Sequence, residues 1–251
     1  MKKFKNLFRI LFFLVIISAV SCKKIIDFLP GKPKNCRIKR IHIIEWSLDY
    51  YGDFYYNKWG NPDSVIFGFV GDGLPNLLLK YNNRKQLIQA KYAYSNVFYE
   101  SWHKFGYANG NITTDTVYIW GSNEEPEPLT YYAKRIDQYE YDNSGRIIKK
   151  IMDQVSPDYP PIELNFSYDA NGNLITQQGL VYDNYTNIHV LHPIWQFLDC
   201  DYNLNNPIPA TSYNNFRLPL GFDHEIPMNE MPRLFFLGRS LDKSVIEYDC
   251  K

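Results

Sequence analysis

The chain has 251 residues, which is enough for one large β domain or two small ones. Hydrophobic residues make up 45% and charged residues 22%, a balance typical of a packed domain and not of an extended disordered chain. Lysine plus arginine and aspartate plus glutamate both number 27, so the net charge of zero gives no overall field that would favour nucleic acid or acidic lipid. The aromatic content of 17%, with 21 Tyr and 16 Phe, suits strands better than helices.

Residues 1–21 have the pattern of a signal peptide. Lys2, Lys3 and Lys5 form a positive start, and an apolar run follows from Ile10 to Val20. This run is much shorter than the ~20 residues that a membrane-spanning helix needs. We therefore expect residues 1–21 to be removed on export.

Cys22 follows the small and apolar residues "SAVS" directly. This arrangement resembles the lipobox of bacterial lipoproteins, although Ala19 stands where that family more often has leucine. The resemblance implies that Cys22 carries lipid and becomes the mature N-terminus, anchored in a lipid bilayer. The alternative is an ordinary secretory signal followed by an incidental cysteine.

Residues 22–35 are rich in lysine, proline and glycine and are expected to form a tether. In Bacteroidetes lipoproteins, which this N-terminus resembles, acidic residues after the cysteine favour export to the cell surface. Lys23 and Lys24 occupy those places here. The resemblance thus implies an outer-membrane anchor in the cell envelope, with the periplasmic face favoured over the surface.

A short pattern recurs along the middle of the chain. Tyr141-Asp142 is followed by Gly145, and Tyr168-Asp169 is followed by Gly172 at the same spacing. A weaker copy keeps the glycine, and two others lack it; they begin at Tyr56 (with Gly60), Tyr81 and Tyr182. Aspartate or asparagine bonds its own backbone two residues on, and glycine supplies the positive φ of hairpin loops. The repeat therefore predicts hairpins in series, with Gly145 and Gly172 at positive φ.

The same spacing resembles the YD repeat of the Rhs family, whose units read Tyr-Asp-x-x-Gly-Arg-Leu. Gly145-Arg146-Ile147 is the nearest match. A closer likeness is to small Bacteroidetes envelope lipoproteins that carry a few YD-like units. The resemblance implies an all-β fold and an envelope location, and it implies no particular reaction.

We expect residues 36–251 to form a single β domain. Alternating patterns predict further strands at 36–46, 63–70, 91–100, 114–121 and 131–142, and a last hairpin with its loop at 238–243. The predicted fold is an antiparallel meander of serial hairpins, strongly curved or closed into a barrel-like sheet. The proline-rich stretch 189–232 interrupts this pattern and is expected to be irregular, with a short helix that begins at Pro193.

After Cys22 the chain contains three more cysteines, Cys36, Cys200 and Cys250. An odd number in an oxidising compartment allows at most one internal disulfide and leaves one thiol. Cys36 precedes the first strand and Cys250 ends the last, so an even number of strands whose edges approach one another would place them at the same end. We therefore predict a Cys36–Cys250 disulfide.

Catalytic and metal-binding motifs are absent from the sequence. No Gly-x-Ser-x-Gly, phosphate loop or His-Glu-x-x-His occurs. His189 and His192 in "HVLHP" lack a third placed ligand, so no metal or cofactor is predicted.

Two functions of different class remain open. The first is a non-enzymatic binding or structural module that takes a protein or glycan partner, and not nucleic acid, through its sheet or through residues 189–232. The alternative is a glycan-acting hydrolase or carbohydrate-binding protein that uses aromatic and acidic residues on a concave face.

Overall fold

A computed structural model describes residues 36–45, 48–71, 73–94, 98–122, 128–153, 160–176, 180–224 and 234–250. Contacts divide the chain into two compact units, Met1–Lys32 and Pro33–Lys251. The expected signal peptide, the tether and Cys22 lie outside the described residues. Within the described ranges, no helix is long and apolar enough to span a membrane.

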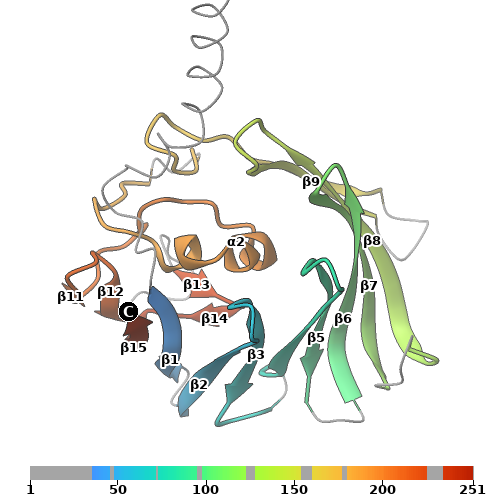
Figure 1. Cartoon of the computed structure of the whole chain (residues 1–251), viewed down its shortest axis with the longest axis horizontal. Helices are drawn as coiled ribbons and strands as arrows, with labels where there is room; N and C mark the ends of the chain where they lie inside the picture. Colours follow the sequence, from blue (N-terminus) through green and yellow to red (C-terminus); the bar gives the residue numbers. More distant parts are fainter. Residues whose placement is uncertain are drawn as a thin grey trace, which may run out of the picture. The chain divides into compact units, whose positions relative to one another are not determined.

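The fold is all-β, as the composition predicts, with one α-helix and one short 3₁₀ helix in the described ranges (Figure 1). The helical elements are η2 (Ile188–Leu191) and α2 (Pro193–Asp199). The strands are β1 (Cys36–Glu45), β2 (Leu48–Tyr56), β3 (Pro62–Phe67), β4 (Asn76–Tyr81), β5 (Leu87–Ala93), β6 (Phe98–Ala108), β7 (Asn111–Ser122), β8 (Tyr131–Tyr141), β9 (Ile147–Asp153), β10 (Ile162–Asn165), β11 (Ser212–Tyr213), β12 (Pro219–Asp223), β13 (Phe235–Phe236), β14 (Arg239–Ser240) and β15 (Lys243–Cys250).

The strands form the predicted antiparallel meander. Strands β1 to β9 each pair with the next strand in sequence, while β15 pairs with β1, β12 with β15, and β11 with β12. The resulting 13-stranded sheet ends at β10 on one side and at β11 on the other. The expectation of a strongly curved or closed, barrel-like sheet is wrong, because the sheet is open and its two terminal strands do not pair with one another.

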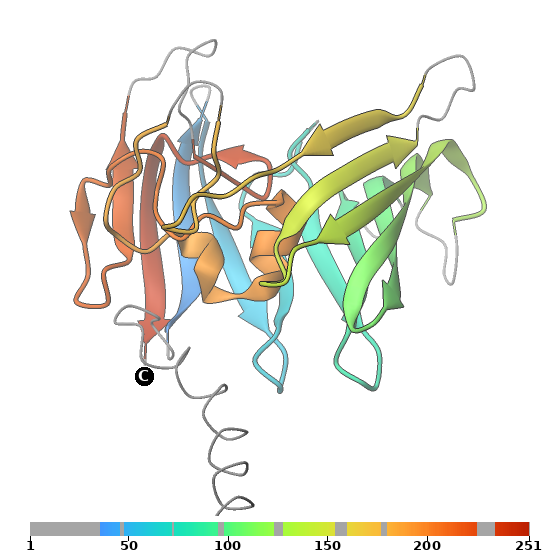
Figure 2. The same cartoon turned by 90° about the horizontal axis from the view of Figure 1, so that it is seen from above.

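The sheet nevertheless bends around α2. Phe54 in β2 contacts Trp195 at 5.7 Å between ring centroids, and Tyr139 in β8 contacts Phe197 at 5.2 Å. In a flat sheet, strands six positions apart would be separated by about 29 Å, whereas the seven-residue helix is only about 10 Å long. The sheet therefore wraps one face towards the helix without closing or curling strongly (Figures 1 and 2).

The hydrophobic core lies between the helix-facing side of the sheet and α2. Trp195 is fully buried and packs against Phe236 of the small β13–β14 hairpin at 5.5 Å and against Phe54 of β2. Strand β2 contributes alternate residues to this core, among them Tyr50 and Phe54. Burying side chains of this size stabilises the fold by about 1.5–3 kcal/mol each.

The repeated sequence pattern forms one kind of turn. The Asp142 carboxylate accepts hydrogen bonds from the backbone N–H groups of Ser144 (2.8 Å) and Arg146 (3.0 Å), and Gly145 has φ 78°. The same pair of bonds recurs at Asn57, Asn82, Asp169 and Asn214. The residue in the glycine place has positive φ in all five turns, at Gly60, Lys85, Gly145, Gly172 and Arg217.

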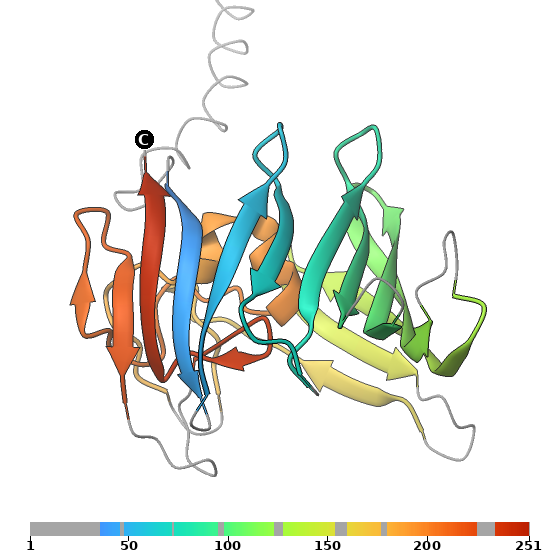
Figure 3. The same cartoon turned by 90° about the horizontal axis from the view of Figure 1, so that it is seen from below.

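The tyrosine of the repeat also forms a hydrogen bond to the backbone of an earlier strand. The Tyr168 hydroxyl donates to the carbonyl of Ile147, the first residue of β9, at 2.9 Å. Six more tyrosine hydroxyls donate to a backbone carbonyl earlier in the chain, at 2.5–3.0 Å: Tyr56 to Ile38, Tyr81 to Pro62, Tyr107 to Leu87, Tyr141 to Ile112, Tyr182 to Leu174 and Tyr248 to Pro219. We call these seven bonds the tyrosine ladder. The hairpin turns between β2 and β3 and between β4 and β5, which follow Tyr56 and Tyr81, project from the same end of the strands (Figure 3).

The Tyr182 copy does not form a hairpin, contrary to the sequence prediction. The Asp183 carboxylate accepts from the N–H of Tyr185, but its second backbone bond comes from Asn206, 23 residues later. Thr186 forms an isolated bridge with Asn205. Because this segment has no residue at positive φ, it does not turn back on itself and instead bonds to Asn205 and Asn206.

Three other predicted segments also differ from the structure. The stretch 91–100 is the end of β5 and the start of β6, separated by residues outside the described ranges. The stretch 189–232 is only partly irregular, because β12 and β11 extend the main sheet beyond β15. At the C-terminus the hairpin joins β13 to β14 through Leu237 and Gly238, both at positive φ, and β15 then pairs with β1.

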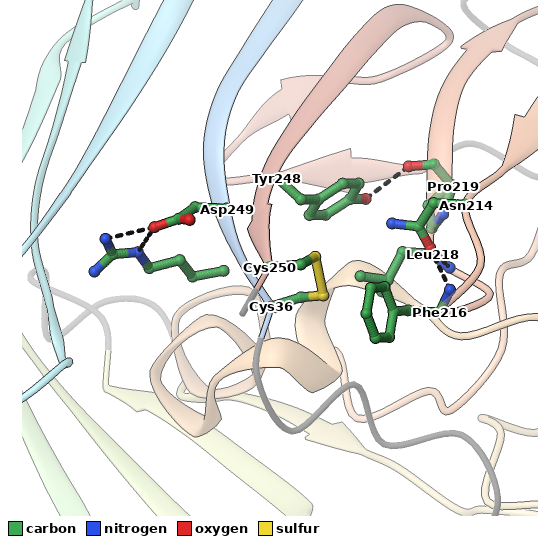
Figure 4. Close-up of a disulfide and its surroundings, with 9 residues drawn as sticks. Cys36, Asn214, Phe216, Leu218, Pro219, Tyr248, Asp249 and Cys250 are labelled. Carbon is green, nitrogen blue, oxygen red and sulfur yellow. Dashed lines mark hydrogen bonds and ion pairs between the residues drawn. A yellow bond between two sulfur atoms is a disulfide. The ribbon is translucent and has the colours of Figure 1, made fainter.

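A disulfide joins Cys36 to Cys250, the pair expected from the sequence (Figure 4). The two residues are paired in register at the start of β1 and the end of β15. The bond links residues 214 positions apart, and a disulfide that closes so long a loop stabilises a domain by about 2–5 kcal/mol. Beside it, Arg37 and Asp249 form an ion pair at 2.6 Å, and Tyr248 makes the last bond of the tyrosine ladder.

Gly145 tests the turn geometry most simply. A Cβ added there would have no atom within 4 Å, so a side chain adds backbone strain alone. We expect Gly145→Val to lower the free energy of unfolding by about 1–2 kcal/mol, and Gly145→Asn to be nearly neutral, since asparagine adopts positive φ readily. Urea unfolding of the two variants measures the difference, and equal losses would contradict the assigned turn. Gly172 is a poorer test, because a Cβ there lies 2.8 Å from the Leu204 side chain and asparagine must displace it.

Candidate functional site

A cluster of polar side chains lies on the helix-facing side of β6 to β9. Asp115 in β7 and Asp137 in β8 are direct register partners, and they are 2% and 0% exposed. Burying a carboxylate is costly unless other groups bond or neutralise it. The two carboxylates meet this demand in different ways.

Asp137 is neutralised by two cations. The Arg135 guanidinium donates through Nε at 2.6 Å and through Nη2 at 3.1 Å, and Lys150 Nζ lies 3.2 Å from the second carboxylate oxygen. Such forked contacts are among the strongest charged hydrogen bonds in proteins. Asp137 is therefore held in place with both of its oxygens occupied.

Asp115 has no cationic partner of this kind. Its Oδ2 contacts His103 Nδ1 at 2.7 Å and accepts from the Tyr139 hydroxyl at 3.4 Å, while Oδ1 is buried without a hydrogen-bond partner in the described part of the chain. The other ring nitrogen of His103 lies 3.2 Å from the hydroxyl of Ser101. Burial, together with the nearby Asp115 charge, raises the pKa of Tyr139, so its phenol stays protonated and can donate.

A cavity of about 520 Å³ opens beside this cluster. Lys150 lines it from β9, and Asp199 and Asp201 line it from the end of α2 and the residues after it. Most of the remaining wall is apolar, formed by Leu164, Phe166, Leu174, Leu180, Leu198, Leu234 and Phe235. This size, and apolar walls with a few polar groups, are typical of sites for small molecules.

The two aspartates of the cavity are already bound to a buried histidine. Asp199 Oδ2 lies 2.8 Å from His189 Nε2, and Asp201 Oδ2 lies 3.3 Å from His189 Nδ1. Burial alone would lower the pKa of His189, but Asp201 and Asp199 outweigh it and raise that pKa. This ion cluster ties η2 to the C-terminal end of α2, so the two aspartates stabilise the wall of the cavity.

The remaining polar groups of this region have structural tasks. Burial raises the pKa of the Cys200 thiol to about 11, which leaves it protonated and a poor nucleophile at neutral pH. Burial lowers the pKa of His192 to about 4, and its neutral ring caps α2 by accepting from the N–H of Ile194 at 3.2 Å. Neither His189 nor His192 is arranged as a metal ligand, because both have protein partners.

A second cavity, of about 670 Å³, lies at the start of β1. It is lined by Tyr56 and Tyr248, whose hydroxyls belong to the tyrosine ladder, and by the ion-paired Arg37 and Asp249. Its polar groups are thus used by the fold itself. The 520 Å³ cavity, where Lys150 can donate to a ligand, is the stronger candidate for a binding site.

The residues singled out from the sequence lie mainly at the turns. Tyr56, Gly60, Tyr141, Asp142, Gly145, Tyr168, Asp169 and Gly172 form ladder bonds and hairpin loops, while Cys36 and Cys250 lock β1 to β15. None of the residues of the polar cluster was predicted from the sequence. A signal was present: "SWHKF" and "RIDQY" place polar side chains at alternate positions of one strand face, where a core strand would carry apolar ones.

The two buried carboxylates do not have the arrangement expected of a glycan hydrolase. Such an enzyme needs one carboxylate on each side of the bond that is cleaved. Asp115 and Asp137 instead lie side by side on one sheet face, and Asp137 is bound to Arg135 and Lys150.

No protein-family model matches the chain, and a comparison with characterised proteins gives no significant match.

Proposed function

We propose that this chain is a lipid-anchored protein of the cell envelope whose β domain binds an amphipathic small molecule in the 520 Å³ cavity. The cavity supports the proposed binding of a small molecule, because its walls are mostly apolar and one cationic side chain, Lys150, lines it. The N-terminal sequence carries the anchoring half. In this view the domain is a binding module held at the membrane.

The anchoring argument rests on Cys22 and the residues before it. A positively charged start, a short apolar run and a cysteine after small residues are the features of a lipoprotein signal. Two or three acyl chains hold a protein at a bilayer stably, since each buried methylene contributes about 0.8 kcal/mol. We place the protein among small envelope lipoproteins with YD-like hairpin units, at the outer membrane and on its periplasmic face.

The cavity also indicates the chemistry of its ligand. Asp199 and Asp201 are occupied by His189, and Asp199 also accepts from the N–H of Leu237 at 2.8 Å. The Lys150 ammonium has three donors; it contacts Asp137 at 3.2 Å and lies 5.6 Å from the centroid of the Tyr139 ring, so a ligand can take a further donor. A ligand with an apolar body and an acidic or hydroxyl-bearing end fits these groups.

The anchoring half is tested by substitution of Cys22. With Cys22→Ala, we expect metabolic incorporation of a fatty-acid probe to disappear and the mature protein to leave the membrane fraction. Wild type and a Cys200→Ala control should both be labelled. Equal labelling of wild type and Cys22→Ala would remove the lipid anchor from the proposal.

The binding half is tested with two neighbouring lysines on opposite sheet faces. Lys150 lines the cavity, whereas Lys149 pairs with Glu163 at 2.9 Å on the other face. The probe 1-anilinonaphthalene-8-sulfonate, an apolar body with an anionic end, should bind at one saturable site. We expect Lys150→Met to weaken binding about tenfold, which corresponds to about 1.4 kcal/mol, and Lys149→Met to leave it unchanged.

Fluorescence titration of the folded variants gives both constants, and thermal melts check that each variant is folded. Binding that does not saturate, or equal affinities of the two lysine variants, would contradict a site in this cavity.

A further inference from the structure

Ser101, His103 and Asp115 form a continuous chain of hydrogen-bonding groups. Ser101 and His103 are two residues apart in β6, so they share the helix-facing side of the sheet with Asp115 of β7. The Ser101 hydroxyl lies 3.2 Å from His103 Nε2, and His103 Nδ1 lies 2.7 Å from Asp115 Oδ2. The order serine, imidazole, buried carboxylate is the one that activates a serine for acyl transfer.

The position of Asp115 fixes the proton on the imidazole. A carboxylate only accepts, so His103 donates its Nδ1 proton to Asp115 and presents the free lone pair of Nε2 to the Ser101 hydroxyl. Asp115 is 2% exposed, and the protonated phenol of Tyr139 supports the same oxygen. The His103 side chain is 19% exposed and Ser101 is half-buried, so the far end of the chain opens to solvent.

The contrast with Asp137 gives a second, independent observation. Asp137 lies directly beside Asp115 and is neutralised by Arg135 and Lys150, whereas the Oδ1 of Asp115 is buried with no partner among the described residues. A buried carboxylate with too few hydrogen bonds is costly, although the fold places Arg135 on the next strand, β8, and Lys150 on the one after it, β9. A carboxylate at this position, 2.7 Å from His103 Nδ1, would stabilise an imidazolium formed at His103 during a reaction.

The surroundings of Ser101 limit what reaches it. The register places Tyr92 of β5 and Ile119 of β7 on either side of Ser101 on the same sheet face. Ser101 is thus a small side chain between two large ones, an arrangement that favours a short acyl group over a long one.

We propose that Ser101, His103 and Asp115 are a catalytic triad that hydrolyses esters of short carboxylic acids, an activity beyond the proposed binding function. Ser101 Oγ attacks the ester carbonyl carbon while Nε2 of His103 takes the hydroxyl proton. The C–O bond to the alcohol breaks, and the imidazolium returns the proton to the departing alkoxide. Water then attacks the acyl-serine with His103 as the base, which releases the acid and restores Ser101.

Covalent labelling of the full mature chain tests the assignment. A fluorophosphonate probe should modify Ser101, identified by peptide mass spectrometry, and Ser101→Ala should lose the label. Ser144→Ala, at an exposed hairpin turn, is the matched control and should be labelled like wild type. With 4-nitrophenyl acetate as substrate, Ser101→Ala and Asp115→Asn should each lower kcat roughly 10³–10⁴-fold, as loss of the serine or of the orienting carboxylate does in known triads.

Thermal melts of the same samples separate loss of chemistry from loss of folding. Failure of wild type to react with the probe, or labelling and hydrolysis by Ser101→Ala equal to wild type, would overturn the triad. So would a folded Asp115→Asn that hydrolyses the ester at the wild-type rate, because the carboxylate would then have no part in orienting His103.

Discussion

The hydrogen bond from a tyrosine hydroxyl to a backbone carbonyl earlier in the chain is the interaction on which the sheet depends. Each such bond contributes about 0.5–1.5 kcal/mol by itself, but seven of them recur along the described part of the chain. Tyr168, for example, lies at the turn that contains Gly172, and its hydroxyl bonds to Ile147, the first residue of β9 after the turn at Gly145. These bonds thereby join neighbouring hairpins to one another, whereas a turn by itself joins only its own two strands.

This coupling determines what faces α2. A slip of one residue in a strand moves every side chain to the other face. With the register fixed, Phe54 and Tyr139 both reach the aromatic side chains of the helix, and the sheet bends around it. The same register brings Asp115 opposite Asp137 and lays Lys150 along the wall of the cavity. The candidate site is thus a consequence of strand pairing between residues distant in sequence.

How much of this could be predicted from the sequence depended on the distance over which each feature is encoded. The turns at Gly145 and Gly172 are local, because an Asx side chain and a positive-φ residue lie within five positions of one another. The turn at Asn214 was not predicted, although Arg217 takes the place that Lys85 takes in the glycine-free copy at Tyr81, and a non-glycine residue at positive φ costs only about 1–2 kcal/mol. The open edge at β10, the return of β12 to β15 and the Ser101–His103–Asp115 chain require strand partners that no local pattern names.

The central claim is that the tyrosine hydroxyls, and not only their rings, hold the hairpins in register. Urea unfolding of Tyr168→Phe against Tyr132→Phe tests it most directly, since Tyr132 is 86% exposed and outside the ladder. Phenylalanine keeps the ring of Tyr168 and removes only the bond to the Ile147 carbonyl. The account predicts a loss of about 1 kcal/mol in the free energy of unfolding for Tyr168→Phe and almost none for Tyr132→Phe. Equal stability of the two variants would show that ring packing alone holds the sheet and would contradict the account.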